Sequence, residues 1–210
     1  FLAATMPRLR RALQYALREF RVADNGCVVT PWLGHDGTSG IVYDRKGNKA
    51  IRYGYGIGNN YYDLLPFGGR DCYATLYLYN ALRKMAALED AVARHPAWGI
   101  GAPPAGLQPA ALRALAEHIA AANTQFWNRV TGRFGTCDYR GRMYDYGFTF
   151  LNCEAAHYGY ASSGQAEHIM QWLEGARIVS NDTSQGADIY RWEFRSEERR
   201  VGKEFRSRWS

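Results

Sequence analysis

The feature that most constrains the fold is a series of segments whose apolar residues recur with the period of an α-helix. The longest follows Asp71, whose carboxylate can cap it, and runs to about residue 94. His95-Pro96 predicts its end, because the residue before a proline resists helical geometry. Its predicted apolar positions are Leu76, Leu82, Met85, Leu88 and Val92.

Four further helices are predicted. The first starts at Pro7, with Leu9, Leu13, Leu17 and Phe20 on its apolar side and Arg8, Arg10, Arg11 and Arg18 on a solvated face. Another starts at Pro109 and ends near residue 128. The last two span 150–161 and 165–174, and Gly175 is a natural C-cap for the second.

Short β-type segments interrupt this helical pattern. Residues 41–44 and 50–53 predict a hairpin around 45–48, and residues 131–147 predict a second hairpin-like insertion around 139–141. There is no βαβ alternation. The sequence therefore predicts a mainly α protein, in which antiparallel helix pairs form part of a helical-hairpin toroid with polar, aromatic loops grouped at one end.

Composition narrows the class of protein. The 210 residues include fifteen Tyr and six Trp, which crowd around polar loops as sugar-stacking sites require. No apolar run is long enough to span a membrane, so we expect no membrane partner. Four cysteines lie far apart without metal-ligand spacing. Localisation stays open, because the chain opens on Phe1 and a lost N-terminus could have carried a secretory signal.

The net charge of +6 is concentrated at the C-terminus. Residues 195–210 carry six basic and three acidic side chains, which leaves 20 basic and 17 acidic residues in 1–194. The tail resembles the in-frame translation of a sequencing-adapter oligonucleotide, so we interpret it as a non-native artefact; the alternative is a genuine basic helix. Without the tail, charge gives little reason to expect a nucleic-acid partner.

The most informative loop is GIGNNYYDLLPFGG, residues 56–69. It combines amides that can bond hydroxyls, flat aromatic rings and one carboxylate, Asp63. The alternative is a glycine-rich turn whose Asn and Asp side chains bond their own backbone. Similar loops contain Trp32, His35 and Asp36, then Asp145 and Tyr146, then Asp188 and Trp192.

Four motifs, TPWLGHDG, GIGNNYYDLLPFG, TGRF with YDYGFTFLNCEA, and DTSQGADIYRW, resemble bacterial six-hairpin glycosidases with an (α/α)6 barrel. That group includes α-L-rhamnosidases, trehalases and glucosidases. The resemblance spans essentially residues 7–192. A full barrel has twelve helices and this chain has about five, so we expect residues 1–194 to be a partial domain of this kind.

The resemblance implies hydrolysis of a glycosidic bond in an oligosaccharide or glycan by two carboxyl groups. The matching loop commonly carries the general acid, which assigns that role to Asp63, and its apolar neighbours are expected to raise its pKa. For the second carboxylate the candidates are Asp145, Asp188 and, more weakly, Asp36; Glu154 is interpreted as structural. The expected substrate-binding residues are Trp32, His35, Asp36, Asn59, Asn60, Tyr61, Tyr62, Tyr146 and Trp192.

Other functions stay open at this point. They are an inactive glycan-binding protein on the same scaffold and a sugar epimerase-like barrel, which would need a His-centred acid/base set. Asp182, Ser184, Gly186 and Asp188 faintly resemble a calcium loop but lack its terminal Glu. No phosphate loop or dinucleotide fingerprint is present, and we expect neither metal nor cofactor.

Overall fold

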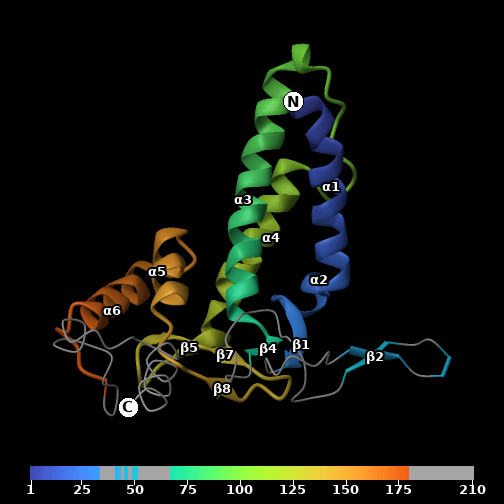
Figure 1. Ribbon diagram of the computed structural model, residues 1–210. Coiled ribbons are helices and arrows are strands. Elements are labelled where there is room, and N and C mark those ends of the chain that lie inside the picture. The colour runs from blue at the N-terminus through green and yellow to red at the C-terminus, as the bar shows by residue number, and fades with distance from the viewer. Residues whose placement is uncertain (34–40, 44, 47–48, 52–66, 180–210) are drawn as a thin grey trace, which may run out of the picture. The chain divides into compact units, whose positions relative to one another are not determined.

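The computed structural model describes residues 1–33, 41–43, 45–46, 49–51 and 67–179 (Figure 1). Its helices are α1 (Leu2–Glu19), α2 (Val22–Asn25), α3 (Cys72–Arg94), α4 (Pro109–Ala121), α5 (Thr149–His157) and α6 (Ser163–Leu173). Two 3-10 helices, η1 (Pro96–Trp98) and η2 (Ala122–Phe126), follow α3 and α4. The mainly helical class is confirmed. Within these residues, no helix has the length and apolar character that crossing a membrane requires.

The five predicted helices are present with corrected ends. Helix α1 starts at Leu2, so Pro7 lies inside the helix instead of at its start. Helix α4 gives way to η2 and then to a strand, because Trp127 and Asn128 pair with a second strand. Helix α5 ends at His157, where the left-handed Gly159 and two bonds to the carbonyl of Ala155 close it.

The described strands are short. They are β1 (Val29–Leu33), β2 (Ile41–Tyr43), β3 (Lys49–Ile51), β4 (Phe67–Arg70), β5 (Trp127–Asn128), β6 (Arg133–Phe134), β7 (Thr136–Cys137) and β8 (Met143–Tyr144). The β2–β3 hairpin confirms the first sequence prediction, with Val42 opposite Ala50. The β7–β8 hairpin confirms the second. The tight β5–β6 hairpin and the four-stranded order β1-β4-β7-β8 were not predicted.

Gly69 explains why β4 can approach β7. Its φ is +63°, and a Cβ at this position would lie 2.6 Å from the carbonyl oxygen of Cys137. Any side chain here would push the two strands apart, so the pairing of Arg70 with Cys137 needs glycine one residue earlier.

The chain divides into two compact units. Unit 1 comprises Phe1–Val29 and Ala74–Ala122, so it holds α1, α2, most of α3 and α4. Within it, α3 runs antiparallel to α1 and α4 (Figure 1). Its core is built from aliphatic side chains of these helices, among them Met6, Leu13, Leu76, Leu82, Leu112 and Ile119.

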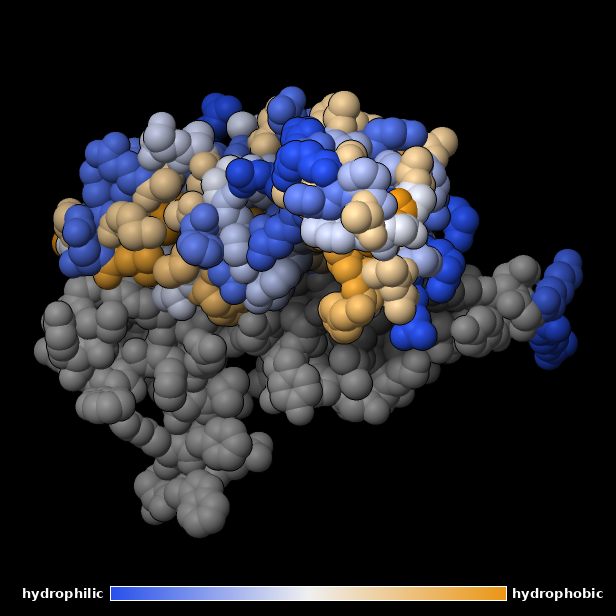
Figure 2. All heavy atoms as spheres, turned by 90° about the horizontal axis from the view of Figure 1, so that it is seen from above, coloured by the Kyte–Doolittle hydropathy of each residue, from blue (hydrophilic) through white to orange (hydrophobic). Residues whose placement is uncertain are grey.

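Hydrophilic residues predominate among the described atoms of the face shown in Figure 2, with smaller hydrophobic areas between them. Between α1 and α3, unit 1 also has an apolar groove of about 400 Å³, lined by Leu9, Leu13, Ala16, Leu78, Ala81, Lys84, Met85 and Leu88. Leu9 is 40% exposed at its edge. The buried stripe of α1 is therefore rotated from the predicted one, toward Met6, Arg10 and Leu13.

Arg10 contradicts the prediction of a solvated arginine face on α1. Its guanidinium forms a two-pronged ion pair with Glu89 of α3, with Nε–Oε1 and Nη2–Oε2 distances both 2.7 Å. The same guanidinium donates to the carbonyls of Gly101 and Ala102. The hydrogen bond to Glu89 raises the pKa of Arg10, against the effect of burial. Glu89 explains the difference, since a buried carboxylate needs a buried cation.

Unit 2 comprises Thr30–Tyr73 and Asn123–Ser210. Its described core is aromatic, with Phe126, Phe134, Phe148, Tyr160 and Trp172 all at most 1% exposed. Helix α6 begins with a capping box in which Ser162 and Gln165 satisfy each other's backbone N–H groups. Gln165 and the buried Asn123 exchange side-chain hydrogen bonds, and Asn123 also donates to the carbonyl of Tyr160. These bonds attach the start of α6 to η2.

We predict that Glu89→Ala lowers the free energy of unfolding by about 3–5 kcal/mol, because it leaves the guanidinium of Arg10 buried without its counter-charge. Urea denaturation of the 210-residue chain measures the effect. Asp90→Ala is the control, because its partner Arg113 is half-exposed and such pairs contribute about 1 kcal/mol or less. Equal losses in the two variants would contradict the prediction.

Candidate functional site

The candidate site is a row of aromatic rings in unit 2. Along the extended segment that follows β8, alternate residues lie on one side, so Tyr144, Tyr146 and Phe148 form successive neighbours. The ring centroids are 6.3 Å apart for the first pair and 5.2 Å for the second. Phe150, in the first turn of α5, continues the row 5.0 Å from Phe148 and contacts Tyr73 of α3 edge-on at 5.1 Å.

Exposure changes along this row. Phe148 is 1% exposed and belongs to the core of unit 2. Tyr144, Tyr146, Phe150 and Tyr73 are intermediate, so part of each ring surface meets solvent. Phe148 is packed within the core, whereas Tyr144 and Tyr146 are half-buried. Flat, amphipathic rings at such positions suit a ligand with an apolar face and a polar edge.

The β7–β8 hairpin holds one end of the row in place. Asp138 Oδ1 accepts the backbone N–H groups of Arg140 and Arg142 at 2.8 and 3.0 Å, which fixes the hairpin tip. The hydroxyl of Tyr139 donates to the carbonyl of Thr30 at 2.6 Å. The guanidinium of Arg142 lies 5.1 Å above the ring of Tyr144. An exposed cation thus stands at the hairpin end of the row.

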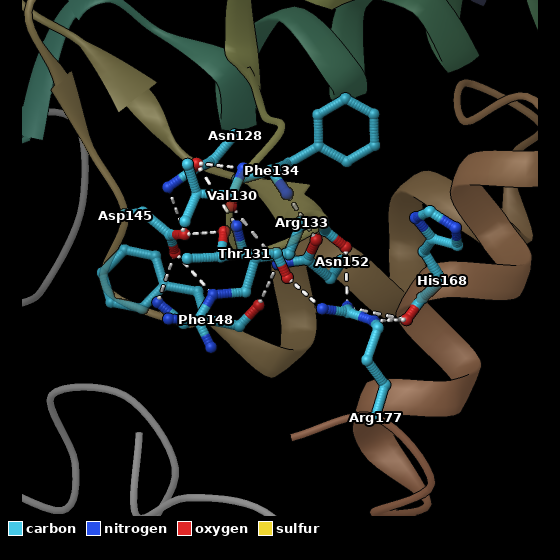
Figure 3. A network of polar contacts seen from close by, with 12 residues as sticks. Asn128, Val130, Thr131, Arg133, Phe134, Asp145, Phe148, Asn152, His168 and Arg177 are labelled. Atoms are coloured by element: carbon cyan, nitrogen blue, oxygen red, sulfur yellow. Dashed lines mark hydrogen bonds and ion pairs between the residues drawn. The ribbon is translucent and has the colours of Figure 1, made fainter. Parts of the chain in front are cut away.

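Asp145, between the two tyrosines, points into a buried polar network (Figure 3). Its Oδ1 accepts from Arg133 Nε at 2.7 Å and from the backbone N–H of Gly147 at 3.0 Å. Its Oδ2 accepts from Asn128 Nδ2 at 3.0 Å and from the hydroxyl of Thr131. These four donors match the lone pairs that a carboxylate offers. The geometry therefore favours a structural role for Asp145, since no lone pair is left to activate water.

Arg133 is enclosed as tightly as its partner. Its side chain is 7% exposed, its guanidinium lies 4.8 Å from the ring centroid of Trp172, and Gly147 covers it from another direction. Gly147 has a φ of +70°, and a Cβ there would lie 2.9 Å from Arg133 Nη1. Glycine at 147 is thus required both by the backbone and by the guanidinium beside it.

Arg177 closes the network from the end of α6 (Figure 3). It donates to the carbonyls of Thr131, Gly132 and His168. Burial lowers the pKa of Arg177, and repulsion by the nearby Arg133 adds to this. Arg177 therefore ties the β5–β6 turn to α6 through backbone carbonyls.

Asn152 connects the network to the aromatic row. This fully buried side chain accepts from the backbone N–H of Phe134 at 2.7 Å and donates to the carbonyl of Phe148 at 2.8 Å. It thereby holds β6 against the segment that carries Tyr144, Tyr146 and Phe148. Removal of the amide would take this acceptor from the backbone N–H of Phe134, whereas the carbonyl of Phe148 would keep the backbone N–H of Asn152.

Most of the residues predicted from the sequence fall outside this region. His35, Asp36, Asn59, Asn60, Tyr61, Tyr62, Asp63, Asp188 and Trp192 lie outside the described residues. Trp32 belongs to β1, but its side chain is likewise outside the description. Of the predicted set, the structure describes the side chains of Asp145 and Tyr146. They are neighbours in the chain, but Asp145 belongs to the buried polar network and Tyr146 to the aromatic row.

The sequence patterns did not identify Arg133, Arg142 or Tyr144. A signal was present for Arg133, since TGRF and YDYGF place opposite charges on two segments that a hairpin can bring together. For Arg142 the signal was its position two residues before Tyr144, which places both on one side of an extended strand. Among the described residues, no group of three or more His, Cys, Asp or Glu side chains is placed to bind a metal ion.

Comparisons with family models, with curated proteins and with solved structures found no match for this chain. The resemblance to six-hairpin glycosidases thus stays a prediction from the motifs quoted above.

We predict that Asp145→Ala lowers the free energy of unfolding by about 3 kcal/mol or more, because it strands the buried guanidinium of Arg133 and several hydrogen-bond donors. Chemical denaturation of the full chain provides the measurement. Asp24→Ala removes an exposed carboxylate paired with Arg21 and should leave stability almost unchanged. A stable Asp145→Ala protein would refute the structural role.

Proposed function

We propose that this protein is carbohydrate-active and hydrolyses a glycosidic bond in an oligosaccharide or glycan, as part of an (α/α)6 glycosidase-like domain. The observation that carries the proposal is the aromatic row, with Tyr144 and Tyr146 half-buried at its hairpin end. Pyranose rings present apolar C–H faces and polar edges, and tyrosine offers a flat ring with a hydroxyl at its rim.

Rigidity of the row supports the same proposal. Asp145 anchors the backbone between Tyr144 and Tyr146, and Asn152 anchors the carbonyl of Phe148. A platform held in place before the ligand arrives loses little conformational entropy on binding. Such preorganisation suits a ligand that offers few strong contacts and many weak ones, as a neutral sugar chain does.

Within this proposal, Asp63 is the general acid, and its partner carboxylate is Asp188 or Asp36. Asp145 ranks below them, because its oxygens are occupied by four donors. Inverting enzymes separate the two carboxyl groups by about 6.5–9.5 Å and retaining enzymes by about 5–5.5 Å, so the distance from Asp63 to its partner would define the stereochemical course.

A non-catalytic glycan-binding protein is the second candidate. The specific observation in its favour is that the one candidate carboxylate among the described residues, Asp145, is committed to an ion pair with Arg133. Both candidates use the aromatic row for binding. They differ in whether Asp63 supports turnover.

We predict that Tyr146→Ala weakens binding of neutral oligosaccharides about tenfold, because loss of one stacking ring removes on the order of 1.4 kcal/mol. Isothermal titration against a panel of cello-, xylo- and malto-oligosaccharides measures it. Tyr15→Ala is the matched control, since Tyr15 of α1 is 54% exposed and lies in unit 1. Equal affinities of wild type and Tyr146→Ala would refute the role of the row.

We predict that Asp63→Asn nearly abolishes hydrolysis without unfolding the protein, because the amide cannot deliver a proton to the leaving oxygen. Release of the chromophore from a panel of aryl glycosides reports turnover, and circular dichroism reports folding. Glycan binding that persists with no turnover in the wild type would favour the non-catalytic candidate. A variant with wild-type activity would eliminate Asp63 as the acid.

A further inference from the structure

The hairpin end of the aromatic row carries a charge that binding of a neutral sugar would not need. Arg142 is exposed, directly precedes β8 and places its guanidinium 5.1 Å above the ring of Tyr144. Tyr144 is in turn next to Tyr146. We infer that Arg142 and Tyr144 form a subsite for the carboxylate of an acidic sugar, so that the preferred glycan contains uronate residues. This inference rests on the proposed glycan-binding function and deepens it.

The stacking geometry suits this role. A guanidinium over an aromatic face is held by attraction between the cation and the π-electrons. Its five N–H donors lie in the guanidinium plane, so a guanidinium that contacts a ring through one face keeps donors available at its edge. Two parallel donors match the two oxygens of a carboxylate, which makes arginine suited to planar, two-pronged recognition. A sugar ring stacked on Tyr146 would carry its carboxylate toward these donors.

The backbone under Arg142 is also fixed. Its N–H donates to Asp138 Oδ1 and its carbonyl accepts from the N–H of Asp138. Asp138 Oδ1 also accepts the backbone N–H of Arg140, so this oxygen is bonded to the backbone of the hairpin tip. Among the described residues, no carboxylate forms an ion pair with the guanidinium of Arg142. The tip therefore offers a positioned cation to an incoming anion.

The same tip contains a matched control. Arg140 is exposed, carries the same charge and lies two residues from Arg142. Among the described contacts, the guanidinium that stacks on the ring of Tyr144 is that of Arg142. If charge is all that matters, Arg140 and Arg142 should contribute equally. If the stacked geometry matters, only Arg142 should discriminate between a carboxylate and its ester.

The experiment titrates the full chain with oligogalacturonate, with its methyl ester and with poly-L-glutamate, and compares wild type with Arg142→Gln, Arg142→Lys and Arg140→Gln. Wild type is expected to bind the acid about tenfold more tightly than the ester, since one charge-assisted, two-pronged contact distinguishes them. Arg142→Gln should bring that ratio close to one, chiefly by weakening binding of the acid. Arg142→Lys should restore only part of the ratio, and Arg140→Gln should preserve it.

Four outcomes overturn the inference. Equal binding of acid and ester by the wild type removes the carboxylate subsite and leaves the proposed function standing. Equal loss in Arg140→Gln and Arg142→Gln, or wild-type binding of poly-L-glutamate as tight as of the acid, reduces the effect to bulk charge. If the wild type binds neither oligogalacturonate, nor its methyl ester, nor any neutral oligosaccharide, the proposed function itself is overturned. Both arginines are exposed, so thermal melting curves should show that every variant folds.

Discussion

The buried ion pair between Arg133 and Asp145 is the contact on which the candidate site depends. It joins the β5–β6 hairpin to the segment that carries the aromatic row, across twelve residues of chain. Removing two charges from water is costly, and the cost is offset only when the remaining donors and acceptors are satisfied. Here Asn128, Thr131 and the backbone of Gly147 complete the carboxylate, while Trp172 covers the guanidinium. Tyr144 and Tyr146 flank this fixed carboxylate, so their positions follow from it.

Unit 1 contains a pair of the same kind. Arg10 and Glu89 are 79 residues apart in sequence and join α1 to α3, and the two carbonyls at 101 and 102 use further donors of the same guanidinium. In both units a buried arginine bonds a carboxylate on one element and is completed by other parts of the chain. Such polar centres give the helices and short strands a defined arrangement. Any other arrangement would leave a buried charge without its partner, which is costly.

The helices were predictable and the polar centres were not. Apolar periodicity predicts both helices. His95-Pro96 predicts the end of α3, and Pro109 predicts the start of α4. Helical periodicity assigns every arginine to the surface, so it predicted a solvated Arg10. Its partner Glu89 lies on the buried side of α3. The partner of a buried charge is chosen by tertiary structure, over a separation that no local pattern covers. The pairing of β4 with β7 was missed for the same reason, since Arg70 and Cys137 lie far apart in the sequence.

Asp145 shows how this limit affects the assignment of function. A carboxylate between two tyrosines has the composition of a sugar-binding loop, and from composition a catalytic and a structural carboxylate look alike. What separates them is the number of donors around the oxygens, which depends on Arg133, Asn128 and Thr131 in another hairpin. The aromatic character of the loop and the charge within it therefore serve different ends. The carboxylate faces inward and holds the segment that carries the rings, while ligand binding by the rings belongs to the proposed function. Within the proposed function, the remaining candidates for the second carboxylate are Asp188 and Asp36, which lie outside the described residues.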